Sequence, residues 1–140
     1  MSLSDLRLPS VLLASQLALG ASVVRPVSAQ ARWRELGQTN VGNTVYVDQK
    51  SVKRAQGVVT GTFRVAFAKP VKSPRGPITS SRTVASLDCA KRQVAIRENI
   101  YFHDEKANRV YDRKVIGTPG WGPPMGGSMP EVAMAQLCPK

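Results

Sequence analysis

The chain has 140 residues, a length that fits one domain, since domains most often contain roughly 100–150 residues. Its 20 Lys and Arg residues against 9 Asp and Glu residues give a formal net charge of +11. This excess predicts that any macromolecular partner carries an anionic face. One histidine and two cysteines exclude a zinc site built from several His and Cys ligands, and they exclude a disulfide-dense scaffold.

Residues 1–29 have the pattern of a secretory signal peptide. Arg7 precedes a mostly apolar stretch, residues 11–24, and Val-Ser-Ala at residues 27–29 places small side chains where signal peptidase prefers them. The apolar stretch is shorter than the about 20 residues that a membrane span needs, and it contains a glutamine. We therefore expect cleavage after Ala29, which leaves a mature chain of 111 residues with 18 basic and 8 acidic side chains and a net charge of +10.

No lipid anchor is expected. Residues 19–22, Leu-Gly-Ala-Ser, resemble a bacterial lipobox in which Ser22 stands where the lipidated cysteine would be, and without that thiol no thioether can form. The sequence thus predicts an exported protein that is periplasmic or secreted, or is associated with the cell surface, without a transmembrane anchor. Export argues against nucleic acid as a partner, and the sequence contains no recognition helix or RNA-binding aromatic signature.

Export also decides how the two cysteines, Cys89 and Cys138, are interpreted. In an oxidising compartment an even pair most simply forms a disulfide. The closed loop of about 50 residues would stabilise the fold by on the order of 4 kcal/mol in the chain-entropy model. The alternative, a nucleophilic cysteine paired with His103, requires a reduced and activated thiol.

Most of the mature chain, residues 31–115, has β-strand patterns. The alternation is clearest where Val59, Phe63 and Val65 fall on one face and threonines on the other. Residues 70–80 contain three prolines and a glycine and predict an exposed loop. In the last long strand, Val94, Ile96, Ile100 and Phe102 are expected to share one face, with Glu98 as the exception. Strands are expected over residues 31–37, 43–48, 58–69, 82–89, 92–102 and 109–115.

The last part of the chain predicts a Gly/Pro-rich connection, residues 117–127, followed by a helix over residues 128–138. Ser128 is expected to cap this helix, and Pro139 to end it. Cys138 falls on the apolar stripe of the helix, so a disulfide to Cys89 would pin the helix onto the sheet. The expected fold is therefore α+β. It is a single domain over residues 30–140, with an antiparallel meander of five or six strands and one C-terminal helix tethered by a disulfide.

Several short motifs follow one another in a specific order along essentially the whole mature chain. They are Trp33-x-x-Leu36-Gly37, Val45-Tyr46-Val47-Asp48-x-x-Ser51-Val52-x-Arg54 with Gly57, Asp88-Cys89-Ala90, Trp121 before a Gly/Pro stretch into Ser128, and Leu137-Cys138. This order resembles the surface-adhesin protein E-like family of exported Gram-negative bacterial proteins. The resemblance implies an antiparallel sheet with a C-terminal helix tethered by a disulfide. It also implies binding to host matrix and serum proteins, although this chain lacks the lipid anchor of the adhesin.

The basic residues carry the main functional prediction. Alternation places Arg64, Arg97 and Arg113 on the outer face of the sheet, together with Asn99 and Tyr101. Lys91 and Arg92 add positive charge from a loop. Such a surface would bind an acidic glycan, lipopolysaccharide phosphates or an acidic protein patch. The alternative is a structural periplasmic protein that uses its net charge for solubility and has no dedicated ligand.

An enzyme is the third hypothesis, and we expect none, nor a cofactor. A hydrolase would rest on Asp48, Ser51 and His103, but Asp and Ser also favour helix starts and turns because their side chains bond nearby backbone amides. His103 with Asp104 and Glu105 could bind a metal weakly, or could be a solvated loop. The glycines of residues 117–127 do not form a phosphate loop. Trp121 either covers the sheet edge or the helix, or it anchors a partner.

Overall fold

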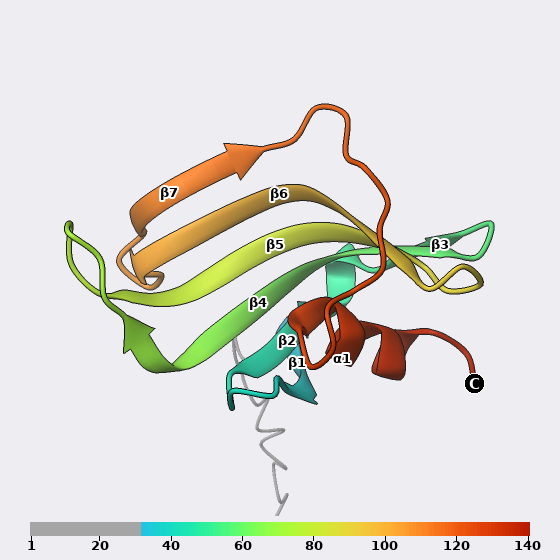
Figure 1. Ribbon diagram of the computed structural model, residues 1–140, viewed down its shortest axis with the longest axis horizontal. Helices are drawn as coiled ribbons and strands as arrows, with labels where there is room; N and C mark the ends of the chain where they lie inside the picture. The colour runs from blue at the N-terminus through green and yellow to red at the C-terminus, as the bar shows by residue number, and fades with distance from the viewer. Residues whose placement is uncertain (1–31) are drawn as a thin grey trace, which may run out of the picture.

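The computed structural model describes residues 32–140, which form one antiparallel sheet with a single α-helix on one of its faces (Figure 1). The expected signal peptide, residues 1–29, lies outside the described residues. Within residues 32–140 there is no helix of the length and hydropathy needed to span a bilayer. The α+β prediction with a C-terminal helix is confirmed.

The sheet has seven strands in the order β1-β2-β4-β5-β6-β7, with β3 paired to β4. Because β5 takes one edge of β4, both β2 and the short β3 pair with its other edge. The sequence predicted five or six strands, and the additional one is β3, which lies in a polar, basic stretch. The elements are β1 (Trp33–Gln38), β2 (Thr44–Asp48), the 3-10 helix η2 (Gln49–Ser51), β3 (Lys53–Ala55), β4 (Val58–Val71), β5 (Ile78–Asp88), β6 (Gln93–Asp104), β7 (Arg109–Val115) and α1 (Met129–Leu137).

The loop predicted over residues 70–80 is shorter than expected, because both of its ends belong to strands. β4 continues to Val71, β5 begins at Ile78, and these two residues pair with each other. The pairing shifts register between Ala66 and Val71, which accommodates Pro70, a residue that has no N–H to donate to a ladder. Only residues 72–77 connect the strands.

A register shift in β6 changes which side chains share a face. Val84 pairs with Glu98 while the next residue, Ala85, pairs with Ile96, so Arg97 is an extra residue. Such a bulge moves every later side chain of the strand to the other face. The predicted apolar face is therefore wrong beyond Ile96. Ile100 pairs with Arg82 and lies on the face that points away from the helix, as Glu98 does.

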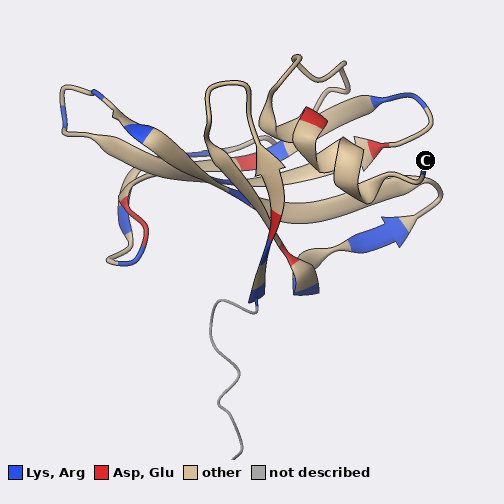
Figure 2. Cartoon of the chain, turned by 90° about the horizontal axis from the view of Figure 1, so that it is seen from below, with Lys and Arg blue, Asp and Glu red and all other residues tan. Residues whose placement is uncertain are grey.

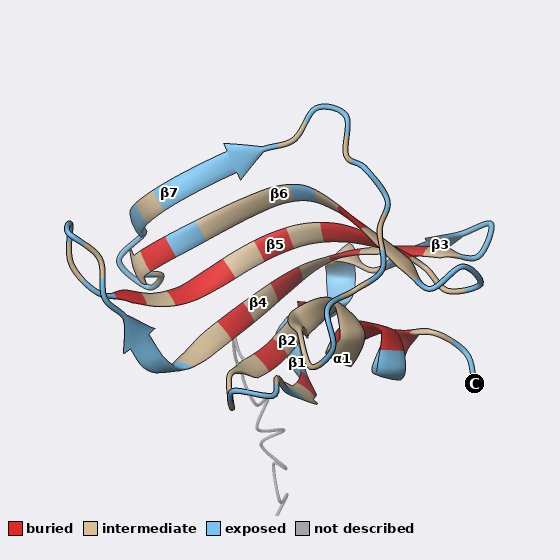
Figure 3. Ribbon diagram, viewed as in Figure 1, coloured by how far each residue is buried: buried red, intermediate tan, exposed pale blue. Residues whose placement is uncertain are grey.

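The hydrophobic core lies between α1 and the face of the sheet that we call the helix face. Phe63, Val45 and Leu87 are fully buried there, and Met134 and Leu137 of α1 pack against them. Figure 3 shows the buried segments running along the middle of β4 and β5 and under α1, while β7 is exposed. The opposite face of the sheet, which we call the open face, carries no α-helix of residues 32–140.

The predicted disulfide is confirmed. Cys89 at the end of β5 is bonded to Cys138 at the end of α1, with 5.5 Å between their Cα atoms. Arg54 adds a second tie, since its Nη1 donates a 2.7 Å hydrogen bond to the carbonyl of Leu137. The C-terminal end of the helix is thus fastened to β3 and to the β5–β6 turn.

Candidate functional site

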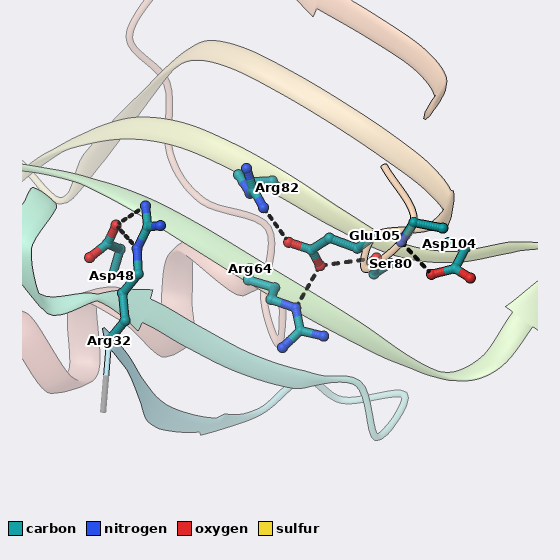
Figure 4. A network of polar contacts seen from close by, with 8 residues as sticks. Arg32, Asp48, Arg64, Ser80, Arg82, Asp104 and Glu105 are labelled. Atoms are coloured by element: carbon teal, nitrogen blue, oxygen red, sulfur yellow. Dashed lines mark hydrogen bonds and ion pairs between the residues drawn. The ribbon is translucent and has the colours of Figure 1, made fainter. Parts of the chain in front are cut away.

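On the open face, two arginines from neighbouring strands converge on one carboxylate. Arg64 on β4 and Arg82 on β5 are paired across the sheet, and each lies 2.6 Å from an oxygen of Glu105. Glu105 comes from the β6–β7 turn and reaches back over the strands, with Ser80 beside it (Figure 4). Glu105 is only 11% exposed, so this contact is a partly buried ion-pair cluster.

Two other arginines of this face also have partners. Arg113 Nε lies 2.8 Å from Glu98 Oε1. Arg97, the bulge residue, donates a hydrogen bond to the hydroxyl of Ser86. The sequence predicted a basic surface on this face. In the structure three of its arginines, Arg64, Arg82 and Arg113, are paired with carboxylates.

Asp48 provides a further acidic partner, at the side of the same face. Its Oδ2 lies 2.7 Å from Arg32 Nη2. Burial by itself raises the pKa of Asp48. The hydrogen bond from Arg32, the backbone N–H of Lys50 and the charges of both residues outweigh that effect, so the pKa is lowered from its usual value. The carboxylate in turn raises the pKa of the Arg32 guanidinium.

Aromatic rings lie under these arginines. The guanidinium carbon of Arg64 is 5.6 Å from the ring centre of Tyr46, and that of Arg82 is 5.8 Å from Trp33 and 5.4 Å from Phe102. Cation–π contacts of this kind stabilise the guanidinium groups in their positions beside the rings. Trp33 and Tyr46, two residues of the family motif, thus support the arginines of the open face.

A second positive surface lies where β5 ends, and we call it the sheet end: Lys53 and Arg54 of β3, and Lys91 and Arg92 of the β5–β6 turn. All four residues are exposed. Figure 2 shows blue segments on β3 and on this turn, on either side of the C-terminus. The carboxylate of Asp88, at the end of β5, accepts the backbone N–H of Lys91, and none of the four basic side chains forms an ion pair within residues 32–140.

The five residues predicted to bind an anionic partner thus fall into two groups. Arg64, Arg97 and Arg113 lie on the open face, whereas Lys91 and Arg92 lie in the turn at the sheet end. Asn99 does not accompany the arginines as expected, because its side chain meets that of Thr83, which pairs with Phe63 on the helix face. The bulge at Arg97 places Tyr101 on that face too, opposite Ser81. Sequence reasoning missed Arg82 and the role of Glu105.

Three residues of the family motif fasten the chain around β3. Asp48 accepts a hydrogen bond from the backbone N–H of Lys50 and so caps η2. The hydroxyl of Ser51 donates to the Asp48 carbonyl and accepts from the N–H of Thr62 on β4. Arg54 holds the end of α1, as described above. These are structural roles, and the sequence favoured such a role for Asp48 and Ser51.

The remaining motif residues lie at turns and edges. Gly57 has φ of +75° in the β3–β4 turn, and its carbonyl accepts the N–H of Cys89. Ser128 precedes α1, but its hydroxyl bonds the carbonyl of Met125 and does not cap the helix. Trp121 is 45% exposed beside Gly122, whose backbone pairs with Val94 and so covers part of the β6 edge.

The residues proposed for a hydrolase do not come together. Ser51 bonds Thr62, which pairs with Val84 in the middle of β5. His103 bonds the Pro77 carbonyl, and its own carbonyl accepts from Thr79. Thr79 and Val84 are five residues apart on β5, which is about 16 Å along a strand. A Ser–His pair therefore cannot form here, and the three-residue hydrolase hypothesis is wrong.

Comparisons with known proteins agree with the fold. Two structures of Haemophilus influenzae protein E, a selenomethionine form and crystal form II, resemble the chain, each with a TM-score of 0.51 and 13% sequence identity. One alignment covers 81% of this chain and 90% of the other, and the second covers 78% and 88%. No curated protein matches the sequence.

The family comparison covers most of the chain. The profile described as surface-adhesin protein E matches residues 33–139, which is nearly the whole part that the structure describes. The match includes every motif on which the resemblance was based, from Trp33 to Cys138. The chain belongs to the surface-adhesin protein E family.

Proposed function

We propose that this chain is an exported, non-enzymatic binding module of the adhesin type, and that the sheet end contacts an anionic partner. The observation that carries the proposal is the contrast in pairing between two positive surfaces. Four exposed cations at the sheet end form no ion pair within residues 32–140. On the open face, carboxylates already hold Arg64, Arg82 and Arg113.

The chemistry of the sheet end fits a partner with several closely spaced negative groups. Lysine and arginine donate charge-assisted hydrogen bonds to phosphate, sulfate and carboxylate oxygens. Exposed charges that are not internally neutralised attract such a partner over about a Debye length, roughly 8–10 Å at physiological salt. An acidic glycan, lipopolysaccharide or an acidic protein patch, such as one on a host matrix protein, has this character.

The test compares two triple variants of the mature domain that lose the same charge. One is Lys53→Gln with Lys91→Gln and Arg92→Gln at the sheet end; the other is Arg64→Gln with Arg97→Gln and Arg113→Gln on the open face. The probes are heparin oligosaccharide and vesicles that contain lipopolysaccharide, titrated over a range of salt concentrations. Thermal melting confirms that each variant is folded.

We expect the sheet-end variant to bind about tenfold more weakly, because three exposed ion pairs contribute up to about 1 kcal/mol each. Its salt dependence should also be shallower, while the folded open-face variant binds almost as the parent does. A loss confined to the open-face variant would overturn the assignment to the sheet end. Binding no stronger than that of an unrelated protein of equal charge would support the alternative, a structural periplasmic protein without a dedicated ligand.

A further inference from the structure

The helix face has a hollow where β4 ends and β5 begins, at the far end of the sheet from the basic surface named the sheet end. A cavity of about 380 Å³ is lined by five apolar or aromatic side chains and one carboxylate. We call this the distal cleft; its lining residues are Phe67, Val71, Ile78, Tyr101, Tyr111 and Asp112. Val71 is 51% exposed and Tyr101 is 36% exposed, so a partner can reach the apolar surface.

The distal cleft is an uncovered continuation of the hydrophobic core. α1 packs against β1 and β2, and Phe67 packs against the edge of the buried cluster beneath it. Figure 3 shows that the far ends of β4 and β7 carry exposed residues while the middle of the sheet is buried. Apolar side chains that line a hollow without a cover favour an apolar occupant.

Positive charge surrounds the cleft. The guanidinium of Arg75 lies 4.3 Å from the ring centre of Tyr111. Lys69 is exposed near the end of β4, and Lys72 is exposed in the β4–β5 connection that also contains Arg75. Lys114 is exposed two residues after Asp112 on β7. Against these four cations, Asp112 is the one acidic residue in the lining. A partner that brings carboxylates around an apolar group would therefore complement the cleft.

The cleft adjoins an open strand edge. β7 is the last strand in the sheet order, so its outer edge presents backbone N–H and C=O groups that no strand of residues 32–140 pairs. Arg109 and Lys114 against Asp112 make this edge positive, while Arg113 is paired with Glu98. Pairing of two β7 strands would oppose like charges, as in natural edges that avoid self-association. An extended acidic segment could instead form backbone hydrogen bonds with the β7 edge, and its negative charges would face the positive charges of that edge.

We propose that the distal cleft and the β7 edge together dock an extended acidic segment of a partner protein, with one apolar side chain inserted among Val71, Tyr101 and Tyr111. The apolar side chain supplies the anchor, and its acidic neighbours contact the cations around the cleft. This inference is independent of the proposed anion site, because the distal cleft and the sheet end lie at opposite ends of β5.

The probe is a short fluorescein-labelled peptide with one phenylalanine flanked by aspartate and glutamate. Two matched peptides separate the contributions: one has glutamine in place of every acid, and the other has serine in place of the phenylalanine. Anisotropy measures the affinity for the mature domain, and amide hydrogen exchange of β7 reports whether the peptide adds as a strand. The Val71→Asp variant is compared with Val41→Asp, since Val41 is a 70% exposed valine in the β1–β2 turn.

We expect the acidic phenylalanine peptide to bind and to slow exchange of β7 amides. Val71→Asp should weaken it about tenfold or more, whereas Val41→Asp and the sheet-end triple variant should not. Equal binding of the serine peptide, or equal loss in the two aspartate variants, would overturn the proposal. Absence of binding to the folded parent domain would overturn it as well. If the parent domain binds the peptide but does not bind heparin, only the proposed anion site is refuted.

Discussion

The open face and the sheet end are both rich in basic residues, yet they differ in what lies opposite each charge. On the open face, Glu105 reaches across two strands and holds two arginines, and Glu98 holds a third. At the sheet end, Lys91 and Arg92 extend from a turn, and Asp88 uses a carboxylate oxygen to bond the backbone of that turn. In the first region carboxylates already neutralise three arginines, and the second region leaves its charge available.

This difference teaches that a count of basic residues does not locate a binding surface. The net charge of the chain is +11, but several of its arginines form ion pairs with carboxylates of the same chain. Partly buried, hydrogen-bonded ion pairs depend strongly on both partners, whereas exposed single charges contribute little to stability. Variants that remove one partner at a time can therefore break or sharpen the comparison.

The largest effect is expected from the disulfide, which holds the sheet end in place without any ion pair. Replacing both Cys89 and Cys138 by serine opens a loop with a sequence separation of 49. We expect the free energy of unfolding to fall by about 4 kcal/mol, because the unfolded chain regains the entropy that the cross-link removes. Urea denaturation measures this loss, and reduction of the parent protein is the matched control.

The part of the disulfide variant that loses hydrogen-exchange protection first distinguishes the sheet end from the open face. Hydrogen exchange should accelerate first at the C-terminal end of α1, where the Arg54 bond to Leu137 and the packing of Met134 and Leu137 remain. Amides of β4 and β5 beneath the open-face network should stay protected at low denaturant. A change in stability below 1 kcal/mol, or faster exchange spread evenly over the sheet, would contradict the view that the disulfide secures the sheet end.

A smaller effect is expected from Glu105→Gln on the open face. The substitution keeps the size of the side chain but leaves Arg64 and Arg82 without a carboxylate. Since the site is partly buried, we expect a loss of about 1–3 kcal/mol. Asp104→Asn is the matched control, because Asp104 accepts only the N–H of Ala107 through Oδ1, which asparagine retains. Equal melting temperatures for the two variants would show that the network does not stabilise the fold.

Much of the fold follows from local pattern. Alternation around Phe63 predicted β4, and the apolar stripe with Cys138 predicted the helix and its tether. The limits of β4 and β5 did not follow, because prolines in the connection suggested a loop, whereas a register shift keeps Val71 and Ile78 paired. β3 was missed because its three residues are exposed and two of them are charged, and its strand form depends on pairing with β4.

The placement of the candidate residues was harder to predict, for a physical reason. Strict alternation predicts one face for a whole strand, and the extra residue at Arg97 reverses that face for everything after it. The contact of Glu105 with Arg64 spans 41 positions, so it depends on sheet order and on how a turn folds back. No local spacing encodes that distance. Lys91 and Arg92, in a hairpin turn, were placed correctly because a turn is a local feature.

The smallest effect is expected from Asp48→Asn, at the margin of the open face. Asparagine keeps an oxygen that can accept the N–H of Lys50 and so cap η2, but it loses the charge that pairs with Arg32. Because Arg32 is 59% exposed, we expect a loss of about 1 kcal/mol or less at neutral pH. Urea denaturation from pH 6 down to pH 2 provides the measurement.

The pH dependence gives this last prediction its sign. The pKa of Asp48 is lowered in the folded protein below its ordinary value of 3.8, so the unfolded chain binds the proton more readily. The resulting stability is fully present above that value and is lost as the pH falls through the lower folded pKa. The difference between parent and Asp48→Asn should therefore shrink in acid. In Arg32→Gln, the burial of Asp48 is less opposed, so its folded pKa rises toward the ordinary value and the part of the acid loss that Asp48 causes should become smaller than in the parent. A parent–variant difference that stays constant down to pH 2 would contradict the pairing of Asp48 with Arg32.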